Sequence, residues 1–205
     1  MNLHQKRQNI RNIPPDLIII ITEGEKTEPA YFKKFPLHVT KILTVIGTGK
    51  NTKSLINEAQ NKVKQVIYDY KEKYGEEPVN PVIWCVFDKD DFPAANFNTA
   101  ILMAKNNGFK VAYSNEAFEL WYLLHFEYID TALTRKQYIE KLNKLLKSNY
   151  NKNDPAMYEK LLDKQKNAIK NAKKLLSSYN PVNPAKDNPS TTIFELVEYL
   201  NQFIR

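Results

Sequence analysis

The sequence has a single cysteine and no apolar run longer than a β-strand, and these shortages exclude several classes of protein. Cys85 alone provides neither a disulfide framework nor a cysteine-based zinc site, which favours a reducing compartment. Apolar runs such as residues 17–21 are too short to cross a membrane. Residues 1–11 are polar and basic and lack the apolar core of a signal peptide. We therefore expect a cytoplasmic protein with no membrane partner.

Repeats, low-complexity tracts and a nucleotide-binding loop are also missing. Residues 47–50 read Gly-Thr-Gly-Lys but lack the spacing of a P-loop, and we interpret them as a turn. A chain of 205 residues with 42% hydrophobic content suits one moderately large domain, or a core domain with a helical extension.

The formal net charge of +7 is concentrated in one part of the chain. Residues 135–174 contain twelve Lys and Arg and four Asp and Glu, whereas the rest of the chain has eighteen and nineteen. A localised basic surface favours a polyanion such as DNA, tRNA or another RNA, although a solvated lysine-rich helix face gives the same count. The candidate nucleic-acid contacts in this region are Lys152, Lys160, Lys166 and Lys170.

The first half of the sequence alternates strand and helix patterns. Apolar and β-branched runs predict strands at 16–22, 39–46, 82–87 and 109–113. Amphipathic segments predict helices at 27–35, with Thr27 as the N-cap, and at 52–74 and 94–107. Strands separated by helices imply parallel crossovers, and strands that are mostly apolar imply helices on both faces. The fold class is therefore α/β, with a parallel sheet of about four strands and flanking helices.

The second half reads as helical. Helices are expected at 116–126, 134–147, 155–177 and 191–203, with Ser114 or Asn115 as the N-cap of the first. Residues 178–190 contain three prolines and predict an ordered loop. We therefore expect a catalytic core at residues 14–115 and a basic helical C-terminal region at 116–205 packed on it.

Two acidic motifs follow predicted strands. Glu23, Glu25 and Glu28 come after the first strand, and Asp88 and Asp90 come after the third. Functional sites collect at the carboxyl ends of parallel strands. Carboxylate oxygens suit Mg²⁺ or Mn²⁺, which activate water and neutralise charge at phosphorus. Against this interpretation, strand ends are often polar and Asp is common in turns.

Two other folds that place acids after strands fit less well. A phospho-receiver domain needs a Lys after a fifth strand, and none is evident. A haloacid-dehalogenase-like site needs Asp-x-Asp after the first strand, where this chain has Glu23.

Glu after strand one and Asp-x-Asp after strand three resemble the Toprim fold of topoisomerases, primases and OLD-type nucleases. More specifically, the chain resembles the RloB (AbiLii-type) family over nearly its whole length. The matching motifs are Ile21-Thr22-Glu23-Gly24-Glu25-Lys26-Thr27-Glu28-Pro29 with Tyr31-Phe32, Phe87-Asp88-Lys89-Asp90, Ser114-Asn115, Phe118-Glu119-Leu120-Trp121 with His125, Tyr150 with Lys152, Ala168-Ile169, Asn171-Ala172 and Asn188-Pro189-Ser190-Thr191.

The resemblance implies a Toprim-like nuclease of bacterial anti-phage defence, of the abortive-infection type, often encoded beside an ATPase. By Toprim analogy Glu23 is the general acid or base, and Asp88 and Asp90 bind Mg²⁺, with Mn²⁺ as an alternative. Glu23 itself is a further candidate metal ligand. A homodimer is a further expectation.

Further candidates come from the residues around these motifs. Glu119 belongs to the predicted helix 116–126, whose start is expected at the same sheet edge, and it is a candidate metal ligand, mainly through the family pattern. His125 is a candidate proton donor or phosphate contact, although a lone His on an apolar face is more often a core residue. Lys26 is a candidate phosphate contact beside the metal, or it offsets its acidic neighbours. Lys152 follows Tyr150 in an asparagine-rich loop, where it can reach a phosphate or stack beside an unpaired base.

Two other functions remain open from the sequence. One is a non-catalytic module in which the acidic loops are structural and the basic helices bind a nucleic acid or an ATPase. The other is a phosphotransfer or nucleotidyl enzyme that acts on a small nucleotide, although the sequence shows no nucleotide-binding loop.

Overall fold

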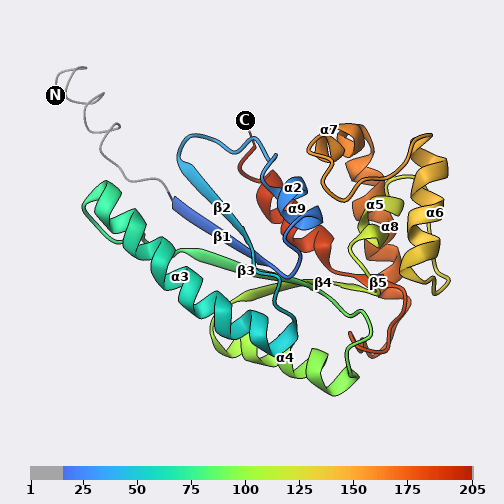
Figure 1. Cartoon of the computed structure of the whole chain (residues 1–205), viewed down its shortest axis with the longest axis horizontal. Coiled ribbons are helices and arrows are strands. Elements are labelled where there is room, and N and C mark those ends of the chain that lie inside the picture. The colour runs from blue at the N-terminus through green and yellow to red at the C-terminus, as the bar shows by residue number, and fades with distance from the viewer. Residues whose placement is uncertain (1–15, 205) are drawn as a thin grey trace.

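The computed structural model describes residues 16–204. The expectations for the basic segment 1–11, for residues 14–15 and for residue 205 lie outside the described residues. Five strands form one sheet in the order β2-β1-β3-β4-β5 (Figure 1). The bounds are Asp16–Thr22 for β1, Lys41–Gly47 for β2, Val82–Asp88 for β3, Lys110–Asn115 for β4 and Ser190–Thr191 for β5. The first four strands pair in parallel, which confirms the predicted α/β class, and β5 pairs with β4 antiparallel.

The central strands β1 and β3 are mostly apolar because both faces of the sheet are covered. The helices are α2 (Thr27–Phe32), α3 (Thr52–Tyr74), α4 (Ala94–Asn106), α5 (Glu119–Leu123), α6 (Arg135–Leu146), α7 (Met157–Leu161), α8 (Gln165–Ser177) and α9 (Ile193–Asn201), with a 3-10 turn at Leu162–Lys164. Ile19, Ile21 and Phe87 pack with α3 and α4 on one face. Ile18, Ile20 and other alternate residues pack with α2, α5, α8 and α9 on the other face.

The C-terminal helices and the sheet share one hydrophobic core. Ile20 and Val86 from the strands belong to the same buried cluster as Leu120, Leu161 and Leu200. Figure 1 shows α5 to α9 gathered beside one end of the sheet, with α9 lying across it. None of the helices in the described part of the chain combines the length and the apolar character needed to cross a bilayer.

Several predicted boundaries differ from the structure. The second strand begins at Lys41 rather than Val39, because the preceding loop is held against the C-terminus by the His38 N–H donating to the Phe203 carbonyl (2.8 Å). The first helix ends at Phe32 and not at Phe35. The predicted helix 155–177 is broken by the 3-10 turn at Leu162–Lys164.

The predicted N-caps are wrong. The N-cap position of α2 is Lys26, no side chain caps this helix, and Thr27 is its first residue. The chain from Ser114 to Asn115 continues β4, and α5 begins only at Glu119. The Ser114 hydroxyl pairs with that of Thr191 at 3.0 Å, so it fastens β5 to the sheet.

Candidate active site at the carboxyl ends of the strands

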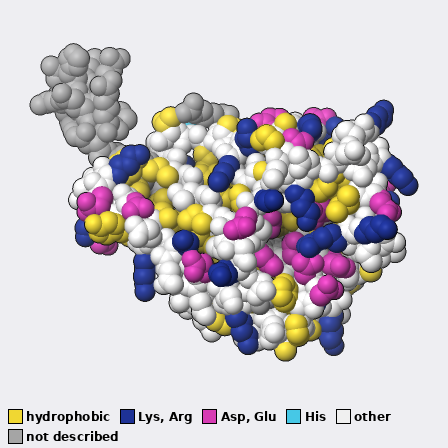
Figure 2. All heavy atoms as spheres, in the orientation of Figure 1, with side chains coloured by type: hydrophobic (Ala, Val, Ile, Leu, Met, Phe, Trp, Pro, Cys, Tyr) yellow, Lys and Arg dark blue, Asp and Glu magenta, His cyan; other side chains and the backbone are white. Residues whose placement is uncertain are grey.

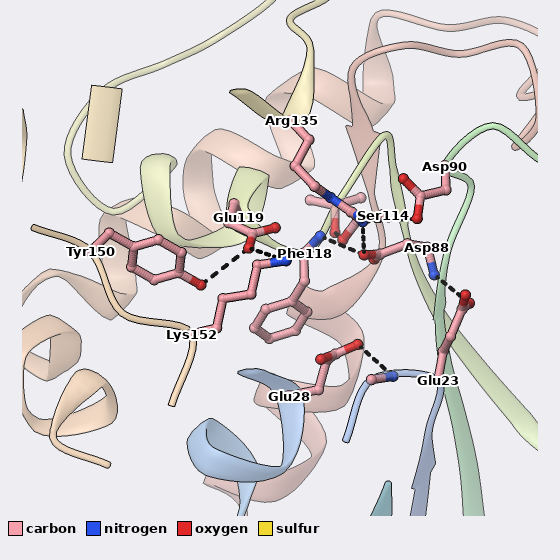
Figure 3. Close-up of polar contacts among 12 residues, drawn as sticks. Glu23, Glu28, Asp88, Asp90, Ser114, Phe118, Glu119, Arg135, Tyr150 and Lys152 are labelled. Carbon is pink, nitrogen blue, oxygen red and sulfur yellow. Dashed lines mark hydrogen bonds and ion pairs between the residues drawn. The ribbon is translucent and has the colours of Figure 1, made fainter. Parts of the chain in front are cut away.

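Glu23 and Asp88 meet at the carboxyl ends of the two central strands. The Glu23 N–H donates to the Val86 carbonyl (2.9 Å), and the Asp88 N–H donates to Glu23 Oε2 (3.4 Å) (Figure 3). Gly47 lets the neighbouring loop approach closely, because a Cβ there would lie 2.6 Å from the Glu25 Cα. The adjacent strands β1 and β3 therefore bring the two acidic motifs together, as the sequence predicts.

Glu28 belongs to the same cluster. Its side chain is buried and accepts a hydrogen bond from the Gly24 N–H at Oε1 (3.2 Å). A Cβ at Gly24 would lie 2.2 Å from Glu28 Oε2, so any other residue there would require this carboxylate to move. Glu28 therefore belongs to the cavity, in addition to lying in the first turn of a helix, where an acidic residue is favourable.

Asp88 and Asp90 share one cation, Arg135. The Arg135 Nη2 lies 3.3 Å from Asp88 Oδ2 and 3.0 Å from Asp90 Oδ2. Asp88 Oδ2 also accepts a hydrogen bond from the Phe118 N–H (3.0 Å). Thr134 positions the arginine, because its side chain and that of Gln137 form a capping box at the start of α6.

Glu119 enters the cluster from α5 with two partners from the loop before α7. The Tyr150 hydroxyl donates to Glu119 Oε1 (3.2 Å), and the Lys152 Nζ lies 3.9 Å from the same oxygen. Glu119 is buried, whereas about half of the Lys152 side chain is exposed. Figure 3 shows Glu119, Asp88 and Glu28 converging from three different elements.

These side chains line a cavity of about 240 Å³. Figure 2 shows acidic side chains gathered on this part of the surface, bordered by Lys and Arg. Six acidic and three basic side chains line it, so the acids outnumber the bases. The lining residues are Glu23, Gly24, Glu25, Lys26, Thr27, Glu28, Asp88, Asp90, Phe118, Glu119, Arg135 and Lys152.

The excess of acid perturbs the carboxyl groups. Burial raises the pKa of Glu23 from 4.5 to about 7, against the hydrogen bond from Asp88, and the negative charge of Glu28 raises it further. Burial and the charges of Glu28 and Glu119 raise the pKa of Asp88 well above its ordinary value, although Arg135 opposes this. Burial also raises the pKa of Glu28. The cavity therefore carries negative charge that its own cations do not offset.

The donor chemistry fits a hard divalent cation such as Mg²⁺ or Mn²⁺, because buried carboxylates with raised pKa values are stabilised by added positive charge. Their spacing is not that of a preformed centre. Within residues 16–204, no three Asp, Glu, His or Cys side chains are arranged to hold a metal ion. Arg135 bridges the two carboxylates that the sequence predicts as ligands.

The structure brings some of the other predicted site residues to the cavity and leaves others away from it. Lys26 and Lys152 line it, whereas Lys160, Lys166 and Lys170 do not. Lys160 is paired with Asp154 (2.6 Å). Lys166 and Lys170 are exposed and lie one turn apart on α8.

His125 lies in the hydrophobic core rather than in the cavity. It is fully buried, its Nδ1 is 2.8 Å from the Trp121 carbonyl oxygen, and its ring packs edge-on against Trp121. Burial lowers its pKa to about 4, so it is neutral at physiological pH. The placement favours the core role that the sequence also indicates, and we assign it no part in the chemistry.

Sequence reasoning missed Arg135 and the hydroxyl of Tyr150 as members of this cluster. Arg135 was visible only as one of twelve basic residues in its region. The capping-box pattern Thr134-x-x-Gln137 marks it as the first residue of a helix, but nothing local shows that this helix end faces the sheet.

The fold and the site together define an α/β protein with a carboxylate-rich cavity at the carboxyl ends of adjacent parallel strands, consistent with a Toprim-like sheet. The sequence matches the family described as RloB-like protein over residues 18–200, and the chain belongs to that family. Neither a curated protein nor a solved structure matches the chain.

Proposed function

We propose that this protein is a divalent-cation-dependent phosphodiesterase that cleaves DNA or RNA. The observation that carries the proposal is the convergence of Glu23, Asp88, Asp90 and Glu119 on one cavity, where burial raises the pKa values of Glu23 and Asp88. A nuclease has to stabilise negative charge on a phosphodiester, and a cation held by carboxylates is the usual means.

Asp88, Asp90 and Glu119 would hold Mg²⁺ or Mn²⁺, with Glu23 or Glu28 completing the oxygen donors. The ion would supply positive charge at the phosphoryl group and lower the pKa of a nearby water molecule. Glu23 has a pKa of about 7, so it exchanges a proton readily near neutral pH and suits general acid or base chemistry.

Lys152, Lys26 and Arg135 are the cavity's own cations and would contact the phosphate. Lys152 is half exposed and is held only loosely by Glu119 at 3.9 Å, so it is free to turn towards a ligand. Arg135 would leave the Asp88–Asp90 pair when a divalent cation takes its place, and its guanidinium suits a phosphate oxygen.

The substrate is expected to be a nucleic acid, because the positive excess of the chain lies between Arg135 and Lys174 and α8 exposes Lys166 and Lys170. From the resemblance to its family we further propose a cytoplasmic role in bacterial anti-phage defence of the abortive-infection type. A partner ATPase and a homodimer are part of the same proposal.

A second candidate is a non-catalytic module that binds nucleic acid or an ATPase. Arg135 favours it, because a bridged Asp88–Asp90 pair is what a structural ion-pair cluster would show. The two candidates differ in whether the acids can be neutralised without loss of the biological effect.

The test is incubation of purified protein with Mg²⁺ or Mn²⁺ and mixed cellular DNA and RNA. Glu23→Gln and Asp88→Asn proteins are assayed in parallel, with Asp91→Asn as the matched control because Asp91 is exposed and does not line the cavity. We expect metal-dependent cleavage by wild type and Asp91→Asn alone, and the cut species identifies the substrate. Equal cleavage by all four proteins would disprove the assignment. No cleavage by any, repeated with the neighbouring ATPase present, would favour the binding module.

A further inference from the structure

Strand β4 is an open edge of the sheet over its amino-terminal half. The antiparallel partner β5 pairs only with Ser114 and Asn115, at the carboxyl end of the strand (Figure 1). The amino-terminal part, from Lys110 to Ala112, pairs with β3 on one side and with no strand on the other among the described residues. An uncovered edge presents backbone donors and acceptors that can pair with another strand.

The direction of these backbone groups follows from the neighbouring residues. The Tyr113 N–H donates to Thr192 Oγ1 (3.0 Å), and its carbonyl accepts from the Thr192 N–H (2.8 Å), so Tyr113 faces away from β3. The Ser114 carbonyl accepts from the Lys89 N–H (2.8 Å), so Ser114 faces β3. Alternation along a strand therefore turns the N–H and C=O of Val111 to the open edge.

A cavity of about 660 Å³ runs beside this edge, and Val111 lines it. Its walls come from α4 and α9 and from the loop before β5, and the exposed side chain of Val182 lies in that loop. Trp84 also lines the cavity and is buried, and its Nε1–H has no acceptor within residues 16–204. The edge thus lies in a groove with apolar walls and unpaired hydrogen-bond donors.

The groove carries more positive than negative charge, which favours an acidic ligand. Lys110 and Lys105 are exposed at its margin, and Glu195 is its one acidic lining residue within the described chain. A lysine on an edge strand often prevents pairing with other strands. Here the Lys110 Nζ lies over the rings of Trp84 (5.4 Å) and Tyr199 (4.8 Å), so its side chain lies against one wall.

We propose that this groove binds an extended, acidic segment of a partner protein, which adds to β4 as a further strand. The segment would pair with the N–H and C=O of Val111, place apolar side chains against the groove walls and place acidic ones near Lys105 and Lys110. The groove is at the amino-terminal half of β3 and β4, whereas the acidic cavity is at the carboxyl ends of β1 and β3. The proposal therefore stands independently of any nuclease activity.

The test uses a random peptide library displayed on phage and selected on the purified full chain. Enriched peptides are synthesised, and their affinities for wild type and variants are measured by fluorescence polarisation. Val111→Pro removes the edge N–H, which an edge strand tolerates, and thermal melting confirms that it folds. Lys105→Glu reverses a charge at the margin without altering the strand, and Lys64→Glu, at an exposed position on α3 away from the groove, is its matched control.

We expect enriched peptides that alternate apolar and acidic residues. Their affinity should fall about tenfold or more in Val111→Pro, because a backbone hydrogen bond is lost and the proline ring obstructs the edge. The affinity should also fall in Lys105→Glu and stay unchanged in Lys64→Glu. Peptides that bind all four proteins equally, or no enrichment at all, would overturn the proposal. The proposal would also be overturned if no peptide binds but an RNA or DNA oligonucleotide does, and if that oligonucleotide loses affinity in Lys105→Glu. The groove would then bind nucleic acid.

Discussion

Replacing Glu23 with glutamine is expected to stabilise the metal-free protein at neutral pH. Burial and the charge of Glu28 raise the pKa of Glu23 from 4.5 to about 7. Between these two values the unfolded chain has lost the proton while the folded chain keeps it. The folded state then binds more protons, and stability falls as pH rises through this window. Glutamine has the same shape, keeps an acceptor for the Asp88 N–H and carries no charge.

The size of the effect follows from the two pKa values. A shift from 4.5 to about 7 corresponds to about 3 kcal/mol of destabilisation at pH 7.5, where the group is ionised in both states. At pH 5 the folded carboxyl is protonated and the unfolded one is mostly ionised, which leaves less than about 1 kcal/mol. The gain from Glu23→Gln should therefore be large at pH 7.5 and small at pH 5.

Urea unfolding in EDTA at both pH values measures this difference. Glu25→Gln is the control, because Glu25 lies in the same loop with an exposed side chain, and its effect should stay within about 0.5 kcal/mol. A gain of equal size at both pH values would show that the effect is not electrostatic. No gain at pH 7.5 would show that the acidic cavity is not under strain in the metal-free protein, and the argument for a cation would lose its main support.

Two other predictions concern the cations around the site. Arg135→Gln should raise the affinity for Mn²⁺ about tenfold in titration calorimetry, because the bridging guanidinium no longer competes for Asp88 and Asp90. The control is Lys136→Gln, which changes the exposed neighbouring residue and should leave the Mn²⁺ affinity unchanged. Weaker Mn²⁺ binding by Arg135→Gln would make the arginine a support of the site rather than a competitor. Lys166→Gln and Lys170→Gln should each lower the salt dependence of nucleic-acid binding by about one ion, and an unchanged slope would remove α8 from the interface.

The regular elements of the first half follow closely from the sequence. Strand β1 and helix α3 have the predicted bounds, because each is a continuous pattern with a clear end. Helix α3 ends at Gly75, which adopts a left-handed conformation with φ of 80°. Glycine is the residue that most often ends a helix in this way. Local pattern and final structure agree here because β1 is buried on both faces and α3 is buried along one face.

The helical region was harder to predict, for two physical reasons. Strand β5 has only two residues, Ser190–Thr191, and its position depends on Thr191 and Thr192 bonding to Tyr113, far away in the sequence. In α5 every residue from Glu119 to Leu123 is buried, so the segment has no polar face to mark where the helix predicted at 116–126 begins and ends. Both segments take their structure from the sheet and not from their own sequence.

The acids of the candidate site were predictable, but their balance of charge was not. Glu23 and Asp88 follow adjacent strands, and parallel strands end at the same edge, so their meeting is a consequence of topology. The approach of Arg135 depends on how the helical region packs on the sheet, which no local pattern reveals. The sequence therefore predicts that these acids meet but not that Arg135 bridges Asp88 and Asp90.

The arrangement of the cavity argues for a ligand more strongly than any single residue does. A purely structural ion-pair cluster would gain stability by matching its acids with bases, yet six acidic side chains meet three basic ones here. Glu28 and Glu119 are buried without an arginine, and the contact of Lys152 with Glu119 is long at 3.9 Å. Raised pKa values at Glu23, Glu28 and Asp88 mean that the folded chain is less stable for holding these groups together at neutral pH. An excess of buried acid that costs stability is expected where added positive charge completes the site. Under the proposed function, Arg135 would supply part of that charge in the metal-free protein and a divalent cation would replace it.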